Sequence, residues 1–441
     1  MIALSRISAL SACVLLSAGA ASHFSPGAFA QERSGLREAA EVTVRGGIPN
    51  ILAKLRAGGG GEIRVAYLGG SITAAPGWRV KSLEWLKRRH PMAQPVEINA
   101  AIGGTGSDLG VFRLEQDVLR HRPDFLFVEF AVNDGGADPA RIHQAMEGIV
   151  RQTWKANPAT DICFVYTVSE PFLADLQAGK CSRSATAMEE VADRYGIPSI
   201  HLGLEAARMV SAGGLVFKAE KPKDEDLLKE PWVFSSDGVH PLVETGHELY
   251  LRTIARSWEA LEAAAGEPKP HALAAPLRED NWEAAKLIPL GEVPREGTWQ
   301  KLDPEKDDLA KRFGRLMPEM WRASEPGAGL RFRFRGTVAG VYDLVGPDGG
   351  QLSVALDGEA AKIVPRFDAY CTYHRLSKLQ VGGNLDGAAV HEARLTLDAA
   401  SPDKRKILFE KNRPDFDGNP AKYEGRNWYA GAVMLIGDLV E

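Results

Sequence analysis

Short apolar runs alternate with amphipathic stretches over the first 265 residues. Runs of strand length occupy residues 63–68, 96–99, 125–130, 162–168 and 199–202. Apolar residues at helical spacing lie between these runs, most clearly over 78–89, 109–119, 139–156 and 184–195. A polar stretch over 213–231 suits a surface loop, and a last helical pattern covers 241–264. Repeated strand–helix–strand units predict α/β class: a three-layer α/β/α fold with a parallel sheet.

The pattern changes to period two in the last third of the chain. Residues 330–335 alternate apolar and charged side chains, as a half-buried strand does. Further candidate strands lie at 338–345, 351–357, 389–397 and 431–440, separated by turn residues. We therefore expect an all-β, jelly-roll-like sandwich. The expected organisation is a leader segment at 1–30, an α/β domain at 31–265, a linker at 266–290 and a β-rich accessory domain at 291–441.

The first thirty residues have the order of a secretory signal peptide. Arg6 precedes an apolar run over 7–21, and the small-residue pattern Ala28-Phe29-Ala30 follows. The run is shorter than the roughly 20 residues that span a bilayer, which argues against a membrane anchor. A lipoprotein processed at Cys13 is a second alternative, but the apolar run continues past that cysteine. We expect cleavage near Ala30 and export to the periplasm or beyond, without stable membrane insertion.

Composition narrows the function classes. A chain of 441 residues exceeds the size of one ordinary core, so two domains are expected. The net charge is only -5, and Lys and Arg are scattered, so a nucleic-acid partner is not expected. After cleavage the cysteines would be Cys163, Cys181 and Cys371, which allow at most one disulfide and lack metal-type spacing. Cys163 lies in an apolar run and is expected to be buried and free.

Ser71 is the candidate nucleophile. It follows the apolar run 63–68 within Gly69-Gly70-Ser71, where a tight turn would expose its hydroxyl. A serine hydroxyl needs a nearby base and hydrogen-bond donors for the developing oxyanion. The alternative is a strand-to-helix turn in which Ser71 only caps the helix.

Three further segments supply the remaining groups. The Gly-rich segment 99–106 follows a strand and offers backbone N–H groups, and Asn133 follows the next strand and offers a side-chain amide. Asp237 and His240 lie three residues apart before the last helix, so the carboxylate can orient the imidazole. Each segment also has an ordinary explanation, as an Asx-turn or a helix cap. Their placement after strands is where open α/β sheets bind ligands.

These four segments resemble the four blocks of the SGNH hydrolase family, also called GDSL-like esterases, over roughly residues 60–260. The resemblance implies a flavodoxin-like sheet, with Ser71 as nucleophile and His240 as base oriented by Asp237. It also implies an oxyanion hole formed by the Ser71 N–H, Gly104 and Asn133, without a metal or organic cofactor.

The chain departs from the family pattern at two positions. Gly70 stands where the first block usually has Asp, which puts the support of the nucleophile turn in doubt. Ala131 stands where the third block usually has Gly, and its methyl group could narrow the site. Neither departure removes a catalytic group.

Export and the β-rich region favour an acylated, in the first place acetylated, carbohydrate as substrate. An exported lipase or lysophospholipase is the alternative enzyme, and a non-catalytic carbohydrate-binding envelope protein is the alternative of another class. Aromatic and polar residues over 367–375 and 427–429 suit stacking on a sugar ring, although a sandwich core and interdomain contact is the favoured explanation. Trp78 and Arg79 are candidate substrate contacts, and the alternative is an amphipathic helix start with Trp78 in the core. Glu129, inside an apolar run, is expected to form a structural ion pair.

Overall fold

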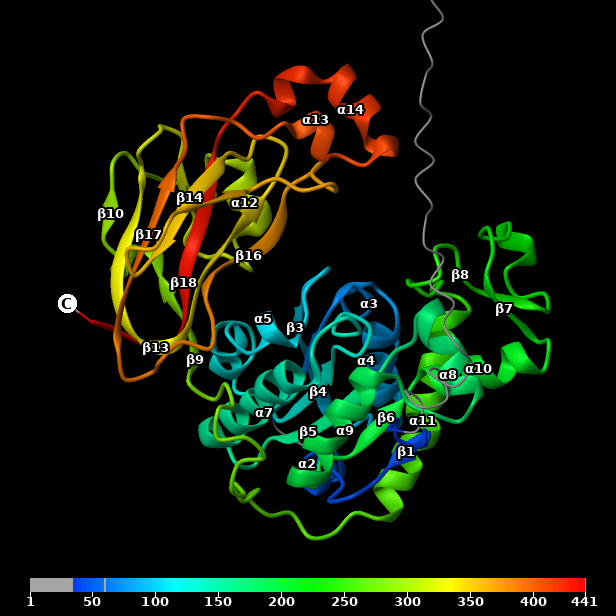
Figure 1. The fold of residues 1–441 in the computed structure, drawn as a ribbon. Coiled ribbons are helices and arrows are strands. Elements are labelled where there is room, and N and C mark those ends of the chain that lie inside the picture. The colour runs from blue at the N-terminus through cyan, green and yellow to red at the C-terminus, as the bar shows by residue number, and fades with distance from the viewer. Residues whose placement is uncertain (1–34, 59–60, 441) are drawn as a thin grey trace, which may run out of the picture. The chain divides into compact units, whose positions relative to one another are not determined.

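The computed structural model describes residues 35–58 and 61–440, with an α/β part followed along the chain by an antiparallel β-rich part (Figure 1). The expected signal peptide at 1–30, including Cys13 and the cleavage site near Ala30, lies outside these residues. Within the described part, none of the helices combines the length and apolar character that crossing a bilayer requires.

In the described residues, a six-stranded sheet in the order β1-β6-β5-β4-β2-β3 forms the centre of the α/β part. Strands β2 to β6 run parallel, and β1 pairs antiparallel with β6. Their order is the flavodoxin-like 2-1-3-4-5 arrangement, so the expected α/β class is confirmed. The strands are β1 (Val42–Thr43), β2 (Glu62–Gly69), β3 (Gln94–Ala101), β4 (Phe125–Glu129), β5 (Asp161–Tyr166) and β6 (Ser199–His201).

Helices cover both faces of this sheet (Figure 1). Along β4, Leu126 and Val128 pack in one hydrophobic cluster with α7 and α9, whereas Phe125 and Phe127 pack in the other with α2, α4 and α11. Burial on both faces explains why residues 125–128 of this strand are all apolar. The helices are α2 (Pro49–Ala57), α3 (Ser71–Ala74), α4 (Trp78–Arg89), α5 (Ser107–Gly110), α6 (Leu114–Asp117), α7 (Pro139–Ala156), α8 (Leu173–Gln177), α9 (Arg183–Tyr195), α10 (Gly203–Ser211) and α11 (Gly246–Ala263).

Local capping explains why the strongest helical patterns were located well. Asp138 accepts a hydrogen bond from the Ala140 N–H and Pro139 follows it, which fixes the start of α7. Ser182 caps α9 in the same way, through the Ala185 N–H. The segment over 109–119, in contrast, forms the two short helices α5 and α6 rather than one helix.

The segment before α11 corrects two expectations. The polar stretch 213–231 is not only a loop, because β7 (Leu215–Lys218) pairs in parallel with β8 (Trp232–Ser235). The last helix begins at Gly246 rather than at residue 241. The chain turns between β8 and α11, where the Leu242 N–H donates to the Phe234 carbonyl over 2.7 Å. Asp237 and His240 therefore lie on a loop.

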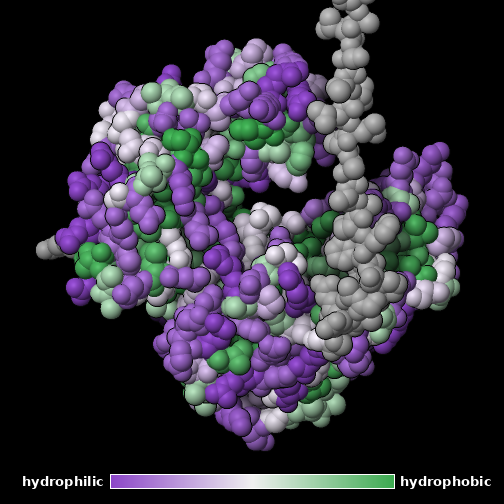
Figure 2. All heavy atoms as spheres, in the orientation of Figure 1, coloured by the Kyte–Doolittle hydropathy of each residue, from purple (hydrophilic) through white to green (hydrophobic). Residues whose placement is uncertain are grey.

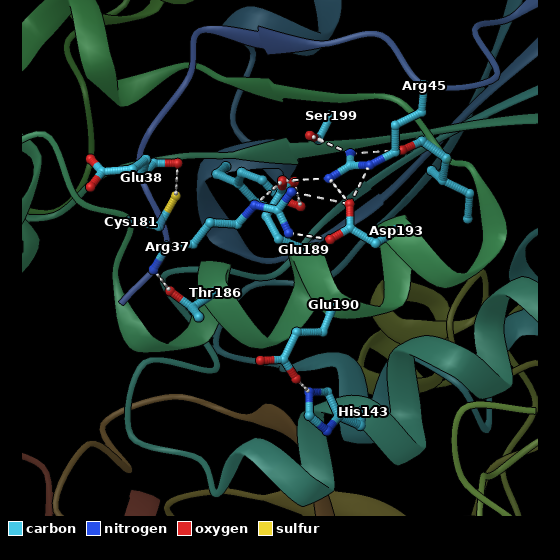
Figure 3. A network of polar contacts seen from close by, with 12 residues as sticks. Arg37, Glu38, Arg45, His143, Cys181, Thr186, Glu189, Glu190, Asp193 and Ser199 are labelled. Carbon is cyan, nitrogen blue, oxygen red and sulfur yellow. Dashed lines mark hydrogen bonds and ion pairs between the residues drawn. The ribbon is translucent and has the colours of Figure 1, made fainter. Parts of the chain in front are cut away.

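A charged network attaches the segment around β1 to helix α9 (Figure 3). Arg45 donates to Glu189 over 2.6 Å and to Asp193 over 2.8 Å, and Arg37 also pairs with Asp193. Glu189 is buried and accepts a further hydrogen bond from the Tyr166 hydroxyl over 2.7 Å. The charge of this buried carboxylate is met by arginine and tyrosine, so removal of either partner would leave it undercompensated.

The β-rich part is one antiparallel sheet, which confirms its expected all-β class. Strand β13 continues through the predicted break near Gly336, at a register shift. Its first half pairs with β17 and its second half with β16, yet both halves contribute to one hydrophobic cluster. The elements are β9 (Ala285–Pro289), β10 (Arg295–Glu296), β11 (Gln300–Lys301), α12 (Asp308–Phe313), β12 (Trp321–Ala323), β13 (Gly329–Val345), β14 (Gln351–Leu356), β15 (Lys362–Pro365), β16 (Arg375–Gly382), β17 (Val390–Leu397), α13 (Lys404–Ile407), α14 (Arg413–Gly418) and β18 (Trp428–Val440).

The segment over 266–284 runs between the two parts without regular structure. It is tied to the α/β part, since His271 pairs with buried Asp161 at 2.7 Å and Asn50 donates to the Lys269 carbonyl over 3.0 Å. The expected domain boundaries stay a prediction, because one hydrophobic cluster contains residues from both sides of this segment.

Candidate active site

The site lies at the carboxyl ends of neighbouring parallel strands. Ser71 begins α3 directly after β2, and Asn133 follows β4, which pairs with β2. The Gly-rich segment 103–106 follows β3, on the other side of β2. The sheet alone therefore brings these three segments to one edge.

The structure places Ser71, His240 and Asp237 in a hydrogen-bonded row. His240 Nε2 lies 2.9 Å from Ser71 Oγ, and His240 Nδ1 lies 2.7 Å from Asp237 Oδ2. A carboxylate beside Nδ1 favours the tautomer with its proton on that nitrogen, which leaves the lone pair of Nε2 facing the serine. The row has the geometry of a nucleophile, a base and an orienting group.

Asp237 is itself held firmly. Its Oδ1 accepts hydrogen bonds from the backbone N–H groups of Val239 and His240, each 2.8 Å long, and from the Ser235 hydroxyl over 3.0 Å. Burial by itself would raise the pKa of Asp237, but the hydrogen bonds it accepts, first from the His240 ring, hold that pKa well below its ordinary range. Asp237 therefore stays a carboxylate at neutral pH.

The loop that carries Asp237 and His240 is open to solvent. Their side chains are 56% and 49% exposed, respectively. The Glu170 N–H donates to the Gly238 carbonyl over 2.7 Å and anchors the middle of the loop. Neither Ser235 nor Glu170 was expected from the sequence, although the run Ser235-Ser236-Asp237-Gly238 is typical of a side-chain-stabilised turn.

The groups expected to bind an oxyanion lie around the Ser71 turn. A Cβ atom built on Gly103 would lie 3.6 Å from Ser71 Cβ, so the Gly-rich segment passes beside the serine. Gly104, the next residue, is exposed and has φ of 74°. The half-buried Asn133 side chain packs directly against Gly70. These contacts put Gly104 and Asn133 in the neighbourhood that the resemblance implies, and their roles stay a prediction.

Gly70 fits the site for a steric reason. A Cβ atom at position 70 would lie 1.8 Å from Asn133 Oδ1 and 2.6 Å from Asn133 Cγ, far inside van der Waals contact. The Asp usual in this block would therefore occupy the space that the Asn133 amide fills here. Ala131, the second departure, does not narrow the site, because its methyl group is buried in the hydrophobic core.

Trp78 and Arg79 do not line the site, which corrects the expectation that they contact substrate. Trp78 is fully buried and its ring packs edge-on against Tyr67 and Phe127. Arg79 is 5% exposed, pairs with Glu97 and donates to the Thr73 carbonyl over 2.9 Å. Both residues face inward from α4, so they support the fold around α3.

The surroundings of two buried carboxyl groups near the site were not predicted from the sequence. Glu129 is not in an ion pair, because its partners are the hydroxyl groups of Thr73 and Thr167. Asp134 accepts a hydrogen bond from the Ser107 N–H over 3.1 Å, whereas its Oδ2 has no partner among the described residues. Burial, the largest influence, raises the pKa of Asp134 to about 7.

The aromatic segments of the β-rich part divide into core and surface. Trp428, Tyr429 and Phe367 are buried, whereas Tyr370 and Tyr373 are each 54% exposed. Phe409 is 41% exposed and packs edge-on against Tyr370. On the face that Figure 2 shows, hydrophobic patches of this part lie among hydrophilic residues. We call Tyr370, Tyr373 and Phe409 the exposed aromatic cluster.

Among the described residues, Cys163, Cys181 and Cys371 are free and buried, so Cys181 and Cys371 do not pair, and the expectation for Cys163 is confirmed. In the part of the chain that the structure describes, groups of three or more His, Cys, Asp or Glu placed to hold a metal ion are absent.

Comparisons with known proteins give a family match and a shared fold. Residues 67–248 match the model of the GDSL-like lipase/acylhydrolase family. Two solved structures of a two-domain esterase active on acetylated mannans, one co-crystallised with mannopentaose, are similar to the chain at 19% sequence identity. Their TM-scores are 0.66 and 0.68, and the likeness covers 93% of this chain and 99% and 100% of theirs, which indicates a shared fold. A search of curated proteins finds no match.

The contact between Gly70 and Asn133 predicts the effect of one methyl group. In Gly70→Ala the new Cβ must displace the Asn133 amide, and loss of one oxyanion donor costs about 10²- to 10³-fold in kcat. We expect a decrease of this order for hydrolysis of a small acetyl ester, with little change in the midpoint of thermal unfolding. Gly136→Ala is the matched control, because a Cβ there meets no atom within 4 Å. Equal kinetics of the two variants would contradict the assignment of Asn133.

The raised pKa of Asp134 predicts a pH-dependent change in stability. The unfolded carboxyl ionises near 3.8 and the folded one near 7, so the native state loses stability as pH rises through this interval. Asp134→Asn cannot ionise and should avoid that loss. The thermal midpoint of the variant minus that of the wild type should therefore be larger at about pH 8 than at about pH 5. A difference that does not change with pH would show that the pKa of Asp134 is not raised in the folded protein.

Proposed function

Because residues 67–248 form a GDSL-like lipase/acylhydrolase domain, we propose that the protein is a serine esterase that removes acyl groups, in the first place acetyl, from a carbohydrate. The observation that carries the proposal is the row of Ser71, His240 and Asp237 with contacts of 2.9 Å and 2.7 Å. These distances permit proton transfer without rearrangement.

The reaction follows from this geometry. Ser71 Oγ attacks the ester carbonyl carbon while its proton passes to His240 Nε2. The tetrahedral intermediate then collapses, the bond to the sugar oxygen breaks, and His240 returns the proton to that oxygen. Water attacks the acyl group on Ser71 with His240 again accepting a proton, which releases the carboxylic acid and restores the serine.

Asp237 and the donors around Ser71 lower the barriers of these steps. The Asp237 carboxylate stabilises the imidazolium that forms at His240 during attack. We assign the Ser71 N–H, the Gly104 N–H and the Asn133 amide as donors to the oxyanion. Such preoriented donors stabilise charge that develops only in the transition state.

Three observations support a carbohydrate ester as the substrate. The exposure of His240 and Asp237 leaves room for a bulky leaving group, whereas a lipase needs an enclosed acyl channel. The two-domain structures similar to both parts of this chain belong to an esterase active on acetylated mannans. The exposed aromatic cluster offers flat apolar surfaces with polar edges, which suit the faces of sugar rings.

Export and domain organisation are part of the same proposal. Export is supported by the sequence pattern over residues 6–30, and the reaction needs no component of the cytoplasm. We propose that residues 37–265 carry the reaction and that the β-rich part after residue 290 contacts the glycan.

Replacement of the nucleophile tests the proposed reaction. Ser71→Ala should lower acetate release from an acetylated glycan by about 10⁴-fold or more, because loss of the triad serine has costs of this order or larger. Ser401→Ala removes an exposed hydroxyl in the β-rich part and serves as the control. Acetate release by Ser71→Ala at the rate of the control would contradict the proposal.

Replacement of the exposed tyrosines tests the substrate class. The double variant Tyr370→Ala/Tyr373→Ala should raise KM for an acetylated polysaccharide by about tenfold, because aromatic contacts each contribute about 0.5–1.5 kcal/mol. Hydrolysis of a small acetyl ester should be unchanged. Ile363→Ala, which also removes a half-exposed apolar side chain of the β-rich part, is the matched control. An unchanged KM for the polysaccharide would argue against contact between this cluster and the substrate.

A further inference from the structure

Glu129 lies beneath the turn that carries Ser71. It is the last residue of β4, and it stands opposite Gly69 of β2 in the register of the parallel pair. Glu129 is almost completely buried, with 1% exposure. A carboxylate in such a place is costly unless several donors meet it.

Two threonine hydroxyls, from the segments that follow β2 and β5, meet the Glu129 carboxylate. Thr73 Oγ1 donates to Oε2 over 2.8 Å, and Thr167 Oγ1 donates to Oε1 over 2.7 Å. The backbone of Gly70 lies close enough to favour the charged form of this carboxyl. Burial, the largest influence, raises the pKa of Glu129, while these hydrogen bonds act in the opposite direction.

The partners of Glu129 flank the nucleophile on both sides. Gly70 precedes Ser71 in the chain, and Thr73 follows it by two residues within α3. Position 70 has no side chain with which to brace the turn, so the turn is braced from the neighbouring strand. The Thr73 hydrogen bond to this buried carboxylate fixes α3 directly after Ser71, and Gly70, directly before Ser71, lies beside the same carboxylate.

The close approach of Thr73 to the end of β4 requires a glycine at position 69. A Cβ atom on Gly69 would lie 2.7 Å from Thr73 Oγ1 and 2.9 Å from the backbone oxygen of Glu129. Only glycine lets the threonine and the strand come together here. The chain following Glu129 leads within four residues to Asn133, so the same strand end carries the amide that packs on Gly70.

We propose that Glu129 is a positioning residue, which holds Gly70 and Thr73 so that Ser71 Oγ stays aligned with His240 and beside the Asn133 amide. The inference rests on the proposed function, since it assigns Ser71 as the nucleophile. Glu129 does not touch the reacting atoms. It acts on the reaction through the backbone of the nucleophile turn.

Variants of Glu129 in the full chain test the proposal through kinetics. Glu129→Ala should lower kcat for a small acetyl ester by about 100-fold, the cost of a misplacement near 1 Å, with KM nearly unchanged. The rate at which a dialkyl aryl phosphate labels Ser71 should fall in parallel. Glu129→Gln keeps the shape and one acceptor oxygen, so it should recover most of both rates. Full rates in Glu129→Ala would overturn the proposal.

Two threonine variants keep the test decisive if Glu129→Ala does not fold. Thr73→Val and Thr167→Val each remove one buried hydroxyl from Glu129, so a purely structural role predicts similar losses of stability and equal kinetics. Positioning predicts that Thr73→Val lowers kcat and the labelling rate about tenfold more than Thr167→Val does. Equal kinetics in this pair would overturn the inference. Failure of the proposed function is separate, because it appears as full activity in Ser71→Ala.

Discussion

The hydrogen bond between Ser71 Oγ and His240 Nε2 is the interaction on which the geometry of the active site depends. It joins groups 169 residues apart in the chain over 2.9 Å. Separate parts of the fold position the two side chains. The end of β2 and the short helix α3 hold the serine, and the turn between β8 and α11 holds the histidine. Both side chains are aligned before any substrate binds. The entropic cost of aligning them therefore falls on folding rather than on each turnover.

The same sheet edge holds two buried carboxyl groups, and burying such groups costs free energy on folding. Glu129 and Asp134 lie within six residues of each other around Asn133, and both are buried. Glu129 accepts hydrogen bonds from two threonine hydroxyls, whereas Asp134 has an oxygen without a partner among the described residues. Departures of this kind from ordinary packing rules are expected at functional sites.

The sequence predicted those features that local pattern controls. Helix α7 is bounded by its Asp138 cap and Pro139, and β4 is an apolar run up to Glu129, so both could be located. The segments around Ser71 and Asn133 could be found because each follows an apolar run, and His240 could be found because Asp237 precedes it by three residues. The features that failed depend on distant partners. Trp78 is a core residue because Tyr67 and Phe127 surround it, and the partners of Glu129 come from α3 and from the residue after β5. The turn that delays α11 to Gly246 likewise depends on Phe234 rather than on helical periodicity.

The most direct test of the account is to identify the residue that carries the acyl group during turnover. The full chain would be mixed with an acetylated glycan, quenched with acid within the first turnover, digested and examined by mass spectrometry. The account predicts an acetyl group on Ser71 that appears before free acetate and is absent from Ser71→Ala. An acetyl group on another residue, or turnover that leaves Ser71 unmodified at every quench time, would contradict it.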